Sequence, residues 1–350
     1  MKYVLLIFSL GIAQFALGQT KDFLKILTTY NAEKNFNGAT IVATNGQIDF
    51  IGGIGIANRQ TATPITPQSK FKIASITKTF TAVLIMKLYE QGQLDLTATI
   101  GKYLPDYVGE AKNKTTIHNL LTYSSGIPNC EGGKDMEVYQ KPRGIDDFIA
   151  KYCSGKLESE PGKQFSYNNG DYILLGRIIE KITGKTFNQY LKETILTPLK
   201  MNNTEMLFSK NIVNGLVNAY VYNDSMKIFY NEDPYFIENF YAAGAMYSTV
   251  EDLLSFDKAL FSYKLLKKES VELMLKPNKQ LGDVGLGFWY TDGYGDIDTP
   301  YVYRPGGILG STTNWIHVLN NNRTIIVFSN TDATNLFELS QQLYKVLMGR

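Results

Sequence analysis

The chain has 350 residues, of which 44% are hydrophobic and 19% are charged, and its formal net charge is +2. This composition is typical of one large globular domain or two closely packed ones. The near-neutral net charge does not indicate binding to a nucleic acid, which usually requires a strongly basic protein surface. The two histidines, His118 and His317, lie far apart, and no Cys/His/Asp cluster has metal-ligand spacing. We therefore expect no metal, no other cofactor and no nucleic acid.

The first eighteen residues, MKYVLLIFSLGIAQFALG, have the pattern of a secretory signal peptide. Lys2 provides the positive start, residues 4–16 form the apolar centre, and Ala16-Leu17-Gly18 is a small-x-small cleavage site. An uncleaved membrane anchor is the alternative, although the apolar run is short for a span. No later segment is long and apolar enough to cross a membrane. We predict an exported protein, periplasmic or extracellular, whose mature part begins at residue 19.

The mature chain is predicted to begin with a helix over residues 21–34, followed by strands over residues 38–44 and 47–54. Asn45-Gly46 between the two strands is a strong signal for a two-residue hairpin turn. The glycines of FIGGIGIAN, residues 50–58, lack the G-x-G-x-x-G spacing of a dinucleotide-binding loop, so a bulged strand end is the better interpretation.

Helical patterns dominate the middle of the chain and strands return near its C-terminus. The predicted helices include residues 115–126, 144–153 and 170–185, the last ended by Gly184. The later strands are predicted at 301–305, 311–320 and 323–330, with a closing helix at 333–348. This order indicates an α+β fold whose sheet is assembled from both ends of the chain.

Two cysteines fall in the helical part of the chain. Cys130 lies in the loop GIPNCEGG, and Cys153 ends a helical pattern. They could pair in an oxidising compartment, but the sequence does not give their separation, so the disulfide is left open.

Ser-x-x-Lys, a spacing that can place a nucleophile beside a base, occurs three times, at Ser69–Lys72, Ser75–Lys78 and Ser255–Lys258. Ser255 and Lys258 lie on the polar side of an amphipathic helical pattern, where a solvated pair is expected. Ser69 and Lys72 flank an extended stretch, in which residues three apart point to opposite sides. Neither of these pairs is expected to cooperate.

Ser75 differs because a helix begins at or just after it and residues 80–88 are apolar nearly all round, which marks a buried helix. A serine at such a helix start has free backbone N–H groups beside it and a field that favours negative charge. Lys78 falls on the same face one turn later, and a lysine in a dry place loses its proton readily and can act as a base. An N-cap serine with a lysine reaching to solvent is the structural alternative.

Further motifs favour the chemical interpretation. Tyr167-Asn168-Asn169 is the only Tyr-x-Asn in the chain, and YRPGGILGS follows at residues 303–311. Ser-x-x-Lys opening a buried helix, then Tyr-x-Asn, then a basic residue-x-Gly on a late strand resemble the serine β-lactamase and penicillin-binding protein superfamily. Within it the chain is most similar to class C β-lactamases and the related D-aminopeptidases, D,D-peptidases and esterases. The similarity covers nearly all of the mature chain, including HNLLTYSSGIP and AAGAMYSTVEDLLSF.

The resemblance implies an antiparallel β-sheet flanked by helices, with an inserted mostly helical subdomain and the active site between them. The sheet part would comprise about residues 19–94 and 250–350, and the helical subdomain about residues 95–249. An aromatic-rich segment, residues 228–246, would form a rim of the cleft or a separate hydrophobic cluster.

The resemblance also implies roles for individual residues. Ser75 would be the nucleophile, Lys78 its base or proton relay, and Tyr167 the residue that protonates the leaving group and activates the deacylating water. Asn169 would donate a hydrogen bond to the substrate amide or to the lysine. The backbone N–H groups of Ser75 and Gly307 would form the oxyanion hole, with Gly306 in the strand that lies against the substrate.

The third motif departs from the family pattern. Relatives usually carry Lys-Thr-Gly or His-x-Gly there, whereas this chain has Arg304-Pro305-Gly306. Arginine cannot release its proton near neutral pH, but it can lower the pKa of Tyr167 and Lys78, and its planar fork suits a substrate carboxylate. We predict that Arg304 binds a substrate carboxylate; an arginine turned outward into a surface ion pair is the alternative.

The function indicated is a secreted serine hydrolase that forms a covalent acyl-enzyme with a peptide, amide or ester, cell-wall peptide being one candidate. The alternatives are a true class C-like β-lactamase, and a non-catalytic or slow-turnover protein that binds cell-wall fragments. Weak or absent β-lactam turnover is expected from Arg304 and Pro305.

Overall fold

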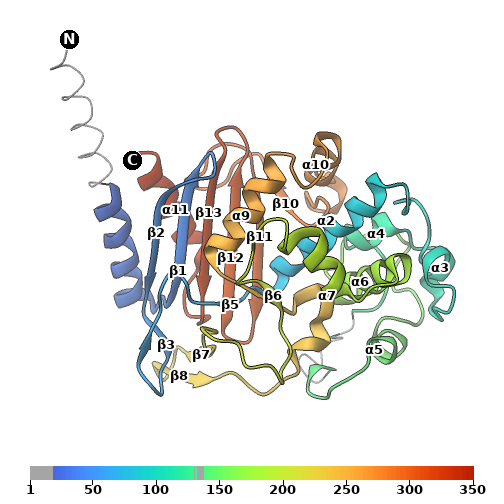
Figure 1. The fold of residues 1–350 in the computed structure, drawn as a ribbon, viewed down its shortest axis with the longest axis horizontal. Coiled ribbons are helices and arrows are strands. Elements are labelled where there is room, and N and C mark those ends of the chain that lie inside the picture. The colour runs from blue at the N-terminus through green and yellow to red at the C-terminus, as the bar shows by residue number, and fades with distance from the viewer. Residues whose placement is uncertain (1–18, 130, 132–137) are drawn as a thin grey trace, which may run out of the picture.

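The computed structural model describes residues 19–129, 131 and 138–350. Its centre is a six-stranded antiparallel sheet with the strand order β10-β11-β12-β13-β1-β2, so that strands from both ends of the chain meet in it (Figure 1). The strands are β1 (Gly38–Thr44), β2 (Gln47–Ile54), β10 (Trp289–Thr291), β11 (Tyr301–Ile308), β12 (Ser311–Val318) and β13 (Arg323–Ser329). The predicted α+β class and the assembly of the sheet from both chain ends are confirmed.

The hairpin of β1 and β2 forms where the sequence predicts it. Asn45 and Gly46 have φ values of 53° and 70°, the positive values that a two-residue turn of this kind requires. The pairing register shifts between Val42 and Ala43, which leaves Asp49 as the extra residue of a β-bulge. The bulge therefore lies before the glycines rather than at the end of the strand.

Each face of the sheet is covered by helices. A helix over residues 19–34 and α11 (Leu336–Leu347) cover one face, where Phe23, Val42 and Leu339 belong to a single hydrophobic cluster (Figure 1). The other face packs against α9 (Val250–Phe261), and its inward residues belong to the main core. Alternate residues of the central strands point into the two layers, as the pleat requires.

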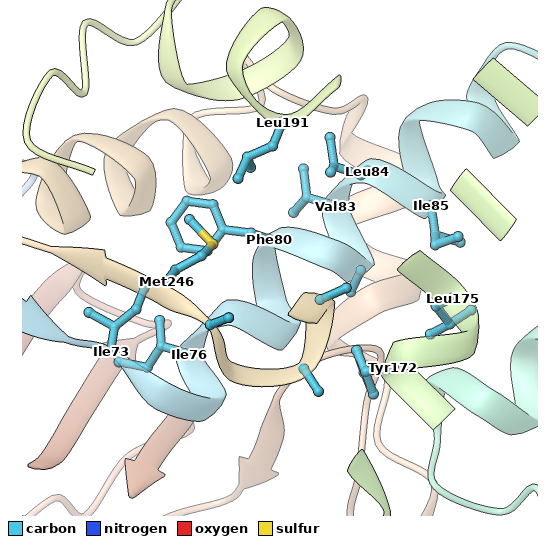
Figure 2. Close-up of a cluster of buried hydrophobic side chains, with 14 of the residues drawn as sticks. Ile73, Ile76, Phe80, Val83, Leu84, Ile85, Tyr172, Leu175, Leu191 and Met246 are labelled. Carbon is cyan, nitrogen blue, oxygen red and sulfur yellow. The ribbon is translucent and has the colours of Figure 1, made fainter. Parts of the chain in front are cut away.

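Helix α2 (Thr77–Glu90) runs through the middle of the molecule and is buried on nearly all sides. It follows a single turn of 3-10 helix, η1 (Ala74–Ile76), and α2 itself begins at Thr77, two residues after Ser75, which agrees with a helix predicted to start at or just after that residue. Figure 2 shows side chains of α2 among those of neighbouring elements, with residues Ile73, Ile76, Phe80, Val83, Leu84, Ile85, Tyr172, Leu175, Leu191 and Met246 labelled. The apolar character of this helix is therefore explained by its central position.

Helices α6 and α8 pack against α2, and further short elements complete the fold. The helices are α3 (Ile100–Tyr103), α4 (Ile117–Leu121), α5 (Ile145–Tyr152), α6 (Asn169–Thr183), α7 (Phe187–Leu191), α8 (Tyr241–Gly244) and α10 (Lys268–Leu275). The shorter strands are β3 (Ile56–Asn58), β4 (Thr63–Pro64), β5 (Phe71–Lys72), β6 (Glu205–Met206), β7 (Tyr220–Asn223), β8 (Ile228–Asn231) and β9 (Met246–Ser248). Short 3-10 or π turns lie at Glu110–Asn113, Lys192–Leu196, Ile237–Phe240 and Lys279–Leu281. The region predicted as mostly helical thus also contains β6 to β9.

Two predictions fall on residues that the structure does not describe. The predicted signal peptide is residues 1–18, and Cys130 is one of the two cysteines whose pairing the sequence leaves open; both lie outside the described ranges. Cys153 is buried. Among the described residues, no helix has the length and apolar character needed to cross a membrane.

Candidate active site

Ser75 is presented by a sharp turn between β5 and α2. Ala74 has a φ of 45°, a left-handed conformation that costs a non-glycine residue conformational energy. On the side of the sheet, Thr313 Oγ1 of β12 donates a hydrogen bond to the carbonyl of Ile73 (3.3 Å). The turn is therefore held from outside by tertiary contacts, and it leaves the Ser75 side chain only half-buried at the start of the buried helix.

The structure brings three of the predicted residues into direct contact. Ser75 Oγ lies 2.7 Å from the hydroxyl of Tyr167 and 3.1 Å from Nζ of Lys78. Lys78 comes from the first turn of α2, and Tyr167 lies two residues before α6. The serine hydroxyl is thus within hydrogen-bond distance of two groups that can accept its proton.

Lys78 is completely buried and its three Nζ positions are all engaged. Asn169 Oδ1 accepts one N–H at 2.6 Å and the carbonyl of Ala243 accepts another at 2.7 Å. The third position faces Ser75 Oγ, and in the neutral amine that position holds the lone pair. Burial lowers the pKa of Lys78; Tyr167 opposes this effect, and the Arg304 charge adds to it. The geometry therefore favours an amine that can take the serine proton.

Tyr167 is poised to ionise more easily than an ordinary tyrosine. Burial alone would raise its pKa, but the charges of Lys78 and Arg304 outweigh burial and lower the pKa of Tyr167 to about 8. Its ring packs against Tyr123 with ring centroids 4.8 Å apart, which fixes the direction of the hydroxyl. A structural role limited to core packing does not explain the contact of this hydroxyl with Ser75.

Asn169 begins α6, and Asn168 before it caps the helix. The Asn168 side chain accepts the N–H of Gly170 at 2.8 Å, which places the next amide beside the lysine. Asn169 Oδ1 accepts from Lys78, and its Nδ2 donates to Glu131 Oε1 at 2.6 Å. Toward the lysine, Asn169 is therefore an acceptor and not the predicted donor, while donation to a substrate amide stays a prediction.

Arg304 lies on β11 and is fully buried, with 0% of its surface exposed. Its Nε donates to the backbone carbonyl of Ser75 at 2.8 Å, and its Nη2 donates to the Tyr167 hydroxyl at 3.3 Å. The guanidinium carbon lies 4.7 Å from the ring centre of Trp289. Both sequence-based interpretations are corrected: Arg304 neither lines the substrate cavity as a carboxylate clamp nor turns outward to a surface ion pair. Its effect on the pKa values of Lys78 and Tyr167 has the predicted direction.

The two glycines of the third motif have different surroundings. A Cβ on Gly306 would lie 2.6 Å from the carbonyl oxygen of Ile73 and 3.1 Å from the backbone nitrogen of Ser75. A Cβ on Gly307 would meet no atom within 4 Å, because this residue lines the cavity. Gly306 therefore allows β11 to approach the nucleophile turn, and Gly307 borders the space available to a substrate.

The cavity in front of Ser75 has a volume of about 310 Å³. It is lined by Ala74, Ser75, Glu131, Tyr167, Asn169, Phe240, Ala243, Gly244, Gly307, Ile308 and Leu309. A larger cavity of about 940 Å³, between the helix of residues 19–34 and α11, is lined by none of these residues. Phe240 places part of the aromatic-rich segment at the cavity wall, while Ile237 of the same segment lies in the main core.

Glu131 was not singled out from the sequence. It occurs in the loop GIPNCEGG, where only the spacing after the HNLLTYSSGIP motif could have drawn attention to it. Its position in the cavity depends on contacts with Asn169 and Tyr139, which lie on other segments of the chain.

The two other Ser-x-x-Lys pairs do not form a site. Ser69 Oγ accepts the N–H of Thr66, while Lys72 pairs with Glu232. Ser255 is exposed on α9 and donates to the carbonyl of Glu251.

Comparisons with known proteins show the family and the fold of the chain. A beta-lactamase family model matches residues 23–346. A penicillin-binding protein of Bacillus subtilis (strain 168) is 26% identical over 337 residues, which covers 91% of this chain and 73% of that protein. Solved structures that share the fold include the following two. The octameric penicillin-binding protein homologue from Pyrococcus abyssi has a TM-score of 0.80 at 24% identity, covering 94% of this chain and 77% of that one. The D-amino acid amidase from Ochrobactrum anthropi SV3, complexed with L-phenylalanine amide, has a TM-score of 0.81 at 23% identity. The match covers 95% of this chain and 99% of that one.

Proposed function

This chain belongs to the beta-lactamase family, and we propose that it is a serine hydrolase that forms a covalent acyl-enzyme at Ser75 with a peptide, amide or ester. One observation carries the proposal: Ser75 Oγ lies 2.7 Å from the Tyr167 hydroxyl and 3.1 Å from Lys78 Nζ, and both of these groups have a lowered pKa. A nucleophile with an adjacent base is the arrangement that acyl transfer requires.

Acylation begins when Ser75 Oγ attacks the carbonyl carbon of the substrate. The serine proton passes to neutral Lys78 or to the Tyr167 phenolate, both of which are within hydrogen-bond distance. The negative oxygen of the tetrahedral intermediate is stabilised by the backbone N–H groups of Ser75 and Gly307. Collapse of the intermediate breaks the bond to the leaving amine or alcohol, which takes a proton from Tyr167.

Deacylation reverses these proton movements with water in place of the leaving group. The Tyr167 phenolate removes a proton from the attacking water, and Ser75 recovers its proton as the acid product departs. Arg304 supports this step without touching the substrate, because its charge stabilises the phenolate. Asn169 and Ala243 hold Lys78 in place throughout.

Two alternatives make different predictions. A class C-like β-lactamase would use the same groups but would release the acyl group of a β-lactam efficiently. A non-catalytic protein that binds cell-wall fragments would not need the contacts among Ser75, Lys78 and Tyr167, so their presence favours an enzyme. Export to the periplasm or exterior and a cell-wall peptide substrate remain part of the proposal.

The test is labelling and turnover with matched variants. We expect a fluorophosphonate adduct on the peptide containing Ser75, and turnover of a 4-nitrophenyl ester that is lost in Ser75→Ala. Lys78→Met and Tyr167→Phe should each lower turnover by about 10²–10⁴-fold, a usual contribution of a general acid or base. Ser255→Ala is the control because Ser255 lies on an exposed face of α9.

Three outcomes would contradict the proposal. An adduct on another serine, or full activity in Ser75→Ala, would remove the nucleophile assignment. Near-native turnover in Tyr167→Phe would make the tyrosine structural. Efficient hydrolysis of a chromogenic cephalosporin, exceeding that of esters and peptides, would instead favour the β-lactamase alternative.

A further inference from the structure

The buried polar residues of α2 are gathered at its start, next to the nucleophile. They are Thr77, Lys78, Thr79 and Thr81, all completely buried, whereas every buried side chain of this helix after Thr81 is apolar. Threonine is a weak helix former, and a buried hydroxyl costs free energy unless it forms a hydrogen bond. We therefore examined which segments of the chain these hydroxyl groups hold.

Thr81 connects α2 to the short helix α8. Its Oγ1 donates a hydrogen bond to the carbonyl of Ala242 at 2.7 Å. The carbonyl of Thr77, four residues earlier in the same helix, is the partner that a threonine inside a helix often takes, but here it lies 3.3 Å from Oγ1. A hydroxyl has only one hydrogen to donate, so the shorter distance indicates that this hydrogen is directed to α8.

Lys78 contacts the next carbonyl of the same segment. Its Nζ donates to the carbonyl of Ala243 at 2.7 Å, one residue after the carbonyl that Thr81 holds. Lys78 and Thr81 lie three positions apart on one face of α2, so this face contacts two consecutive carbonyls of α8. The planar peptide unit of the Ala242 carbonyl extends to the Cα of Ala243, and fixing the first carbonyl therefore restricts the second.

Helix α8 requires support from its neighbours because its backbone begins in an unfavourable conformation. Tyr241 has a φ of 43°, a value that costs a residue with a side chain conformational energy. On the side of α6, a Cβ on Gly176 would overlap with the side chain of Ala242, so these two helices are in close contact. The segment is thus held between α6 and α2, with the Thr81 hydroxyl fixing it from the side of α2.

We propose that Thr81 is a positioning residue for acyl transfer: it fixes the carbonyl of Ala243, which in turn orients the Lys78 amine toward Ser75 Oγ. This inference rests on the proposed acyl-enzyme mechanism and adds to it a residue that touches neither the substrate nor the nucleophile. Loss of the Thr81 hydroxyl would leave the Ala242 carbonyl buried without this partner, which favours a shift of the segment. A displacement of about 1 Å in a catalytic group is enough to slow a reaction strongly.

The experiment compares variants that differ in the hydroxyl at this position. Thr81→Val keeps the shape of the side chain and removes the hydroxyl, whereas Thr81→Ser keeps the hydroxyl. With a 4-nitrophenyl ester, Thr81→Val should lower kcat by about tenfold to a hundredfold, with a smaller change in KM, and Thr81→Ser should retain most of the wild-type kcat. Thr79→Val is the matched control, because Thr79 is also completely buried and donates to the carbonyl of Gly287 at 2.8 Å instead of to α8. It should lose stability like Thr81→Val but keep kcat.

A double-mutant cycle shows whether Thr81 acts through Lys78. The readout is the rate at which a fluorophosphonate labels Ser75. Thr81→Val should slow this labelling in the wild-type background but not in Lys78→Met, where no amine remains to be oriented. A purely structural effect would be equally large in both backgrounds.

Three outcomes would overturn the inference: wild-type kcat in folded Thr81→Val, the same loss of kcat in Thr81→Ser, or equal slowing of the labelling in both backgrounds. Circular dichroism establishes that each variant is folded, and Thr81→Ala provides the same comparisons if Thr81→Val does not fold. Failure of the acyl-enzyme proposal is distinguishable, because Ser75 of the wild type would then take no fluorophosphonate adduct.

Discussion

At the scale of single residues, the most informative side chain is Arg304, because it combines a permanent charge with complete burial. Buried charges require compensating contacts. Arg304 has the Ser75 carbonyl, the Tyr167 hydroxyl and the ring of Trp289 as neighbours. It therefore contributes to the reaction through the electric field it exerts on Tyr167 and Lys78, rather than through contact with a substrate.

Replacing Arg304 by methionine should change the pH dependence of turnover. The phenolate form of Tyr167 increases as the pH rises through its pKa of about 8, and loss of the neighbouring charge should move this pKa upward. The part of the pH profile in which kcat rises as Tyr167 ionises should therefore move to higher pH. At pH 7, kcat should fall about tenfold for every pH unit by which this part of the profile moves. Arg59→Met, which removes an arginine stacked on Phe229, is the control.

The same variant separates the field effect from a carboxylate clamp. A field effect lowers turnover equally for carboxylate-bearing and neutral esters. An unchanged pH profile, or a selective rise in KM for carboxylate-bearing substrates, would contradict a field-mediated role of Arg304.

At the scale of elements, two consecutive glycines of strand β11 have different roles. Gly306 allows the strand to approach the turn that carries Ser75, and Gly307 borders the cavity. Gly306→Ala should lower the free energy of unfolding by about 1–3 kcal/mol, the usual cost of overpacking, because its Cβ would press on the backbone of Ile73. Gly307→Ala should change stability by no more than about 0.5 kcal/mol but should raise KM, because its methyl group would project into the cavity. Urea unfolding and steady-state kinetics on both variants provide the measurement, and each is the control for the other. A loss of stability in Gly307→Ala, with a raised KM but normal stability in Gly306→Ala, would contradict this assignment of roles.

The elements that the sequence predicted well are those with strong local signals. The Asn45-Gly46 turn set the β1–β2 hairpin, and Gly184, with a φ of 68°, ends α6 as expected. The left-handed conformation of Ala74 could not be predicted, because alanine carries no preference for it and the turn is held by residues far away in the sequence. The short strands β6 to β9 were likewise missed, since strands of two to four residues have too few positions for a periodic pattern.

The same distinction applies to the site. Ser75, Lys78 and Tyr167 belong to spaced motifs, and the family resemblance that these motifs carry predicted that the three residues share one site. The burial of Arg304 depends on aromatic residues from other elements, among them Tyr123 and Trp289, so its surroundings were inaccessible to sequence reasoning.

At the scale of the whole molecule, one hydrophobic core connects the sheet to the helices around α2. Ile41 of β1, Phe80 of α2, Leu175 of α6 and Ile326 of β13 all belong to it. We therefore expect a single cooperative unfolding transition, with equal calorimetric and van't Hoff enthalpies. Two resolved transitions by scanning calorimetry, or non-coincident near- and far-ultraviolet circular dichroism, would indicate that the helical region unfolds separately.

The placement of β1 between β2 and β13 also has a consequence for the order in which the chain can fold during synthesis. The side chain of Ser329, at the end of β13, donates to the carbonyl of Asn37, a residue 292 positions earlier. One edge of β1 therefore lacks its neighbour until almost the entire chain has emerged from the ribosome. Such long-range pairing makes folding slow, and an unpaired strand edge is prone to aggregate. The nascent protein should consequently depend on holding chaperones for most of its synthesis, because β1 stays without this neighbour until β13 is made.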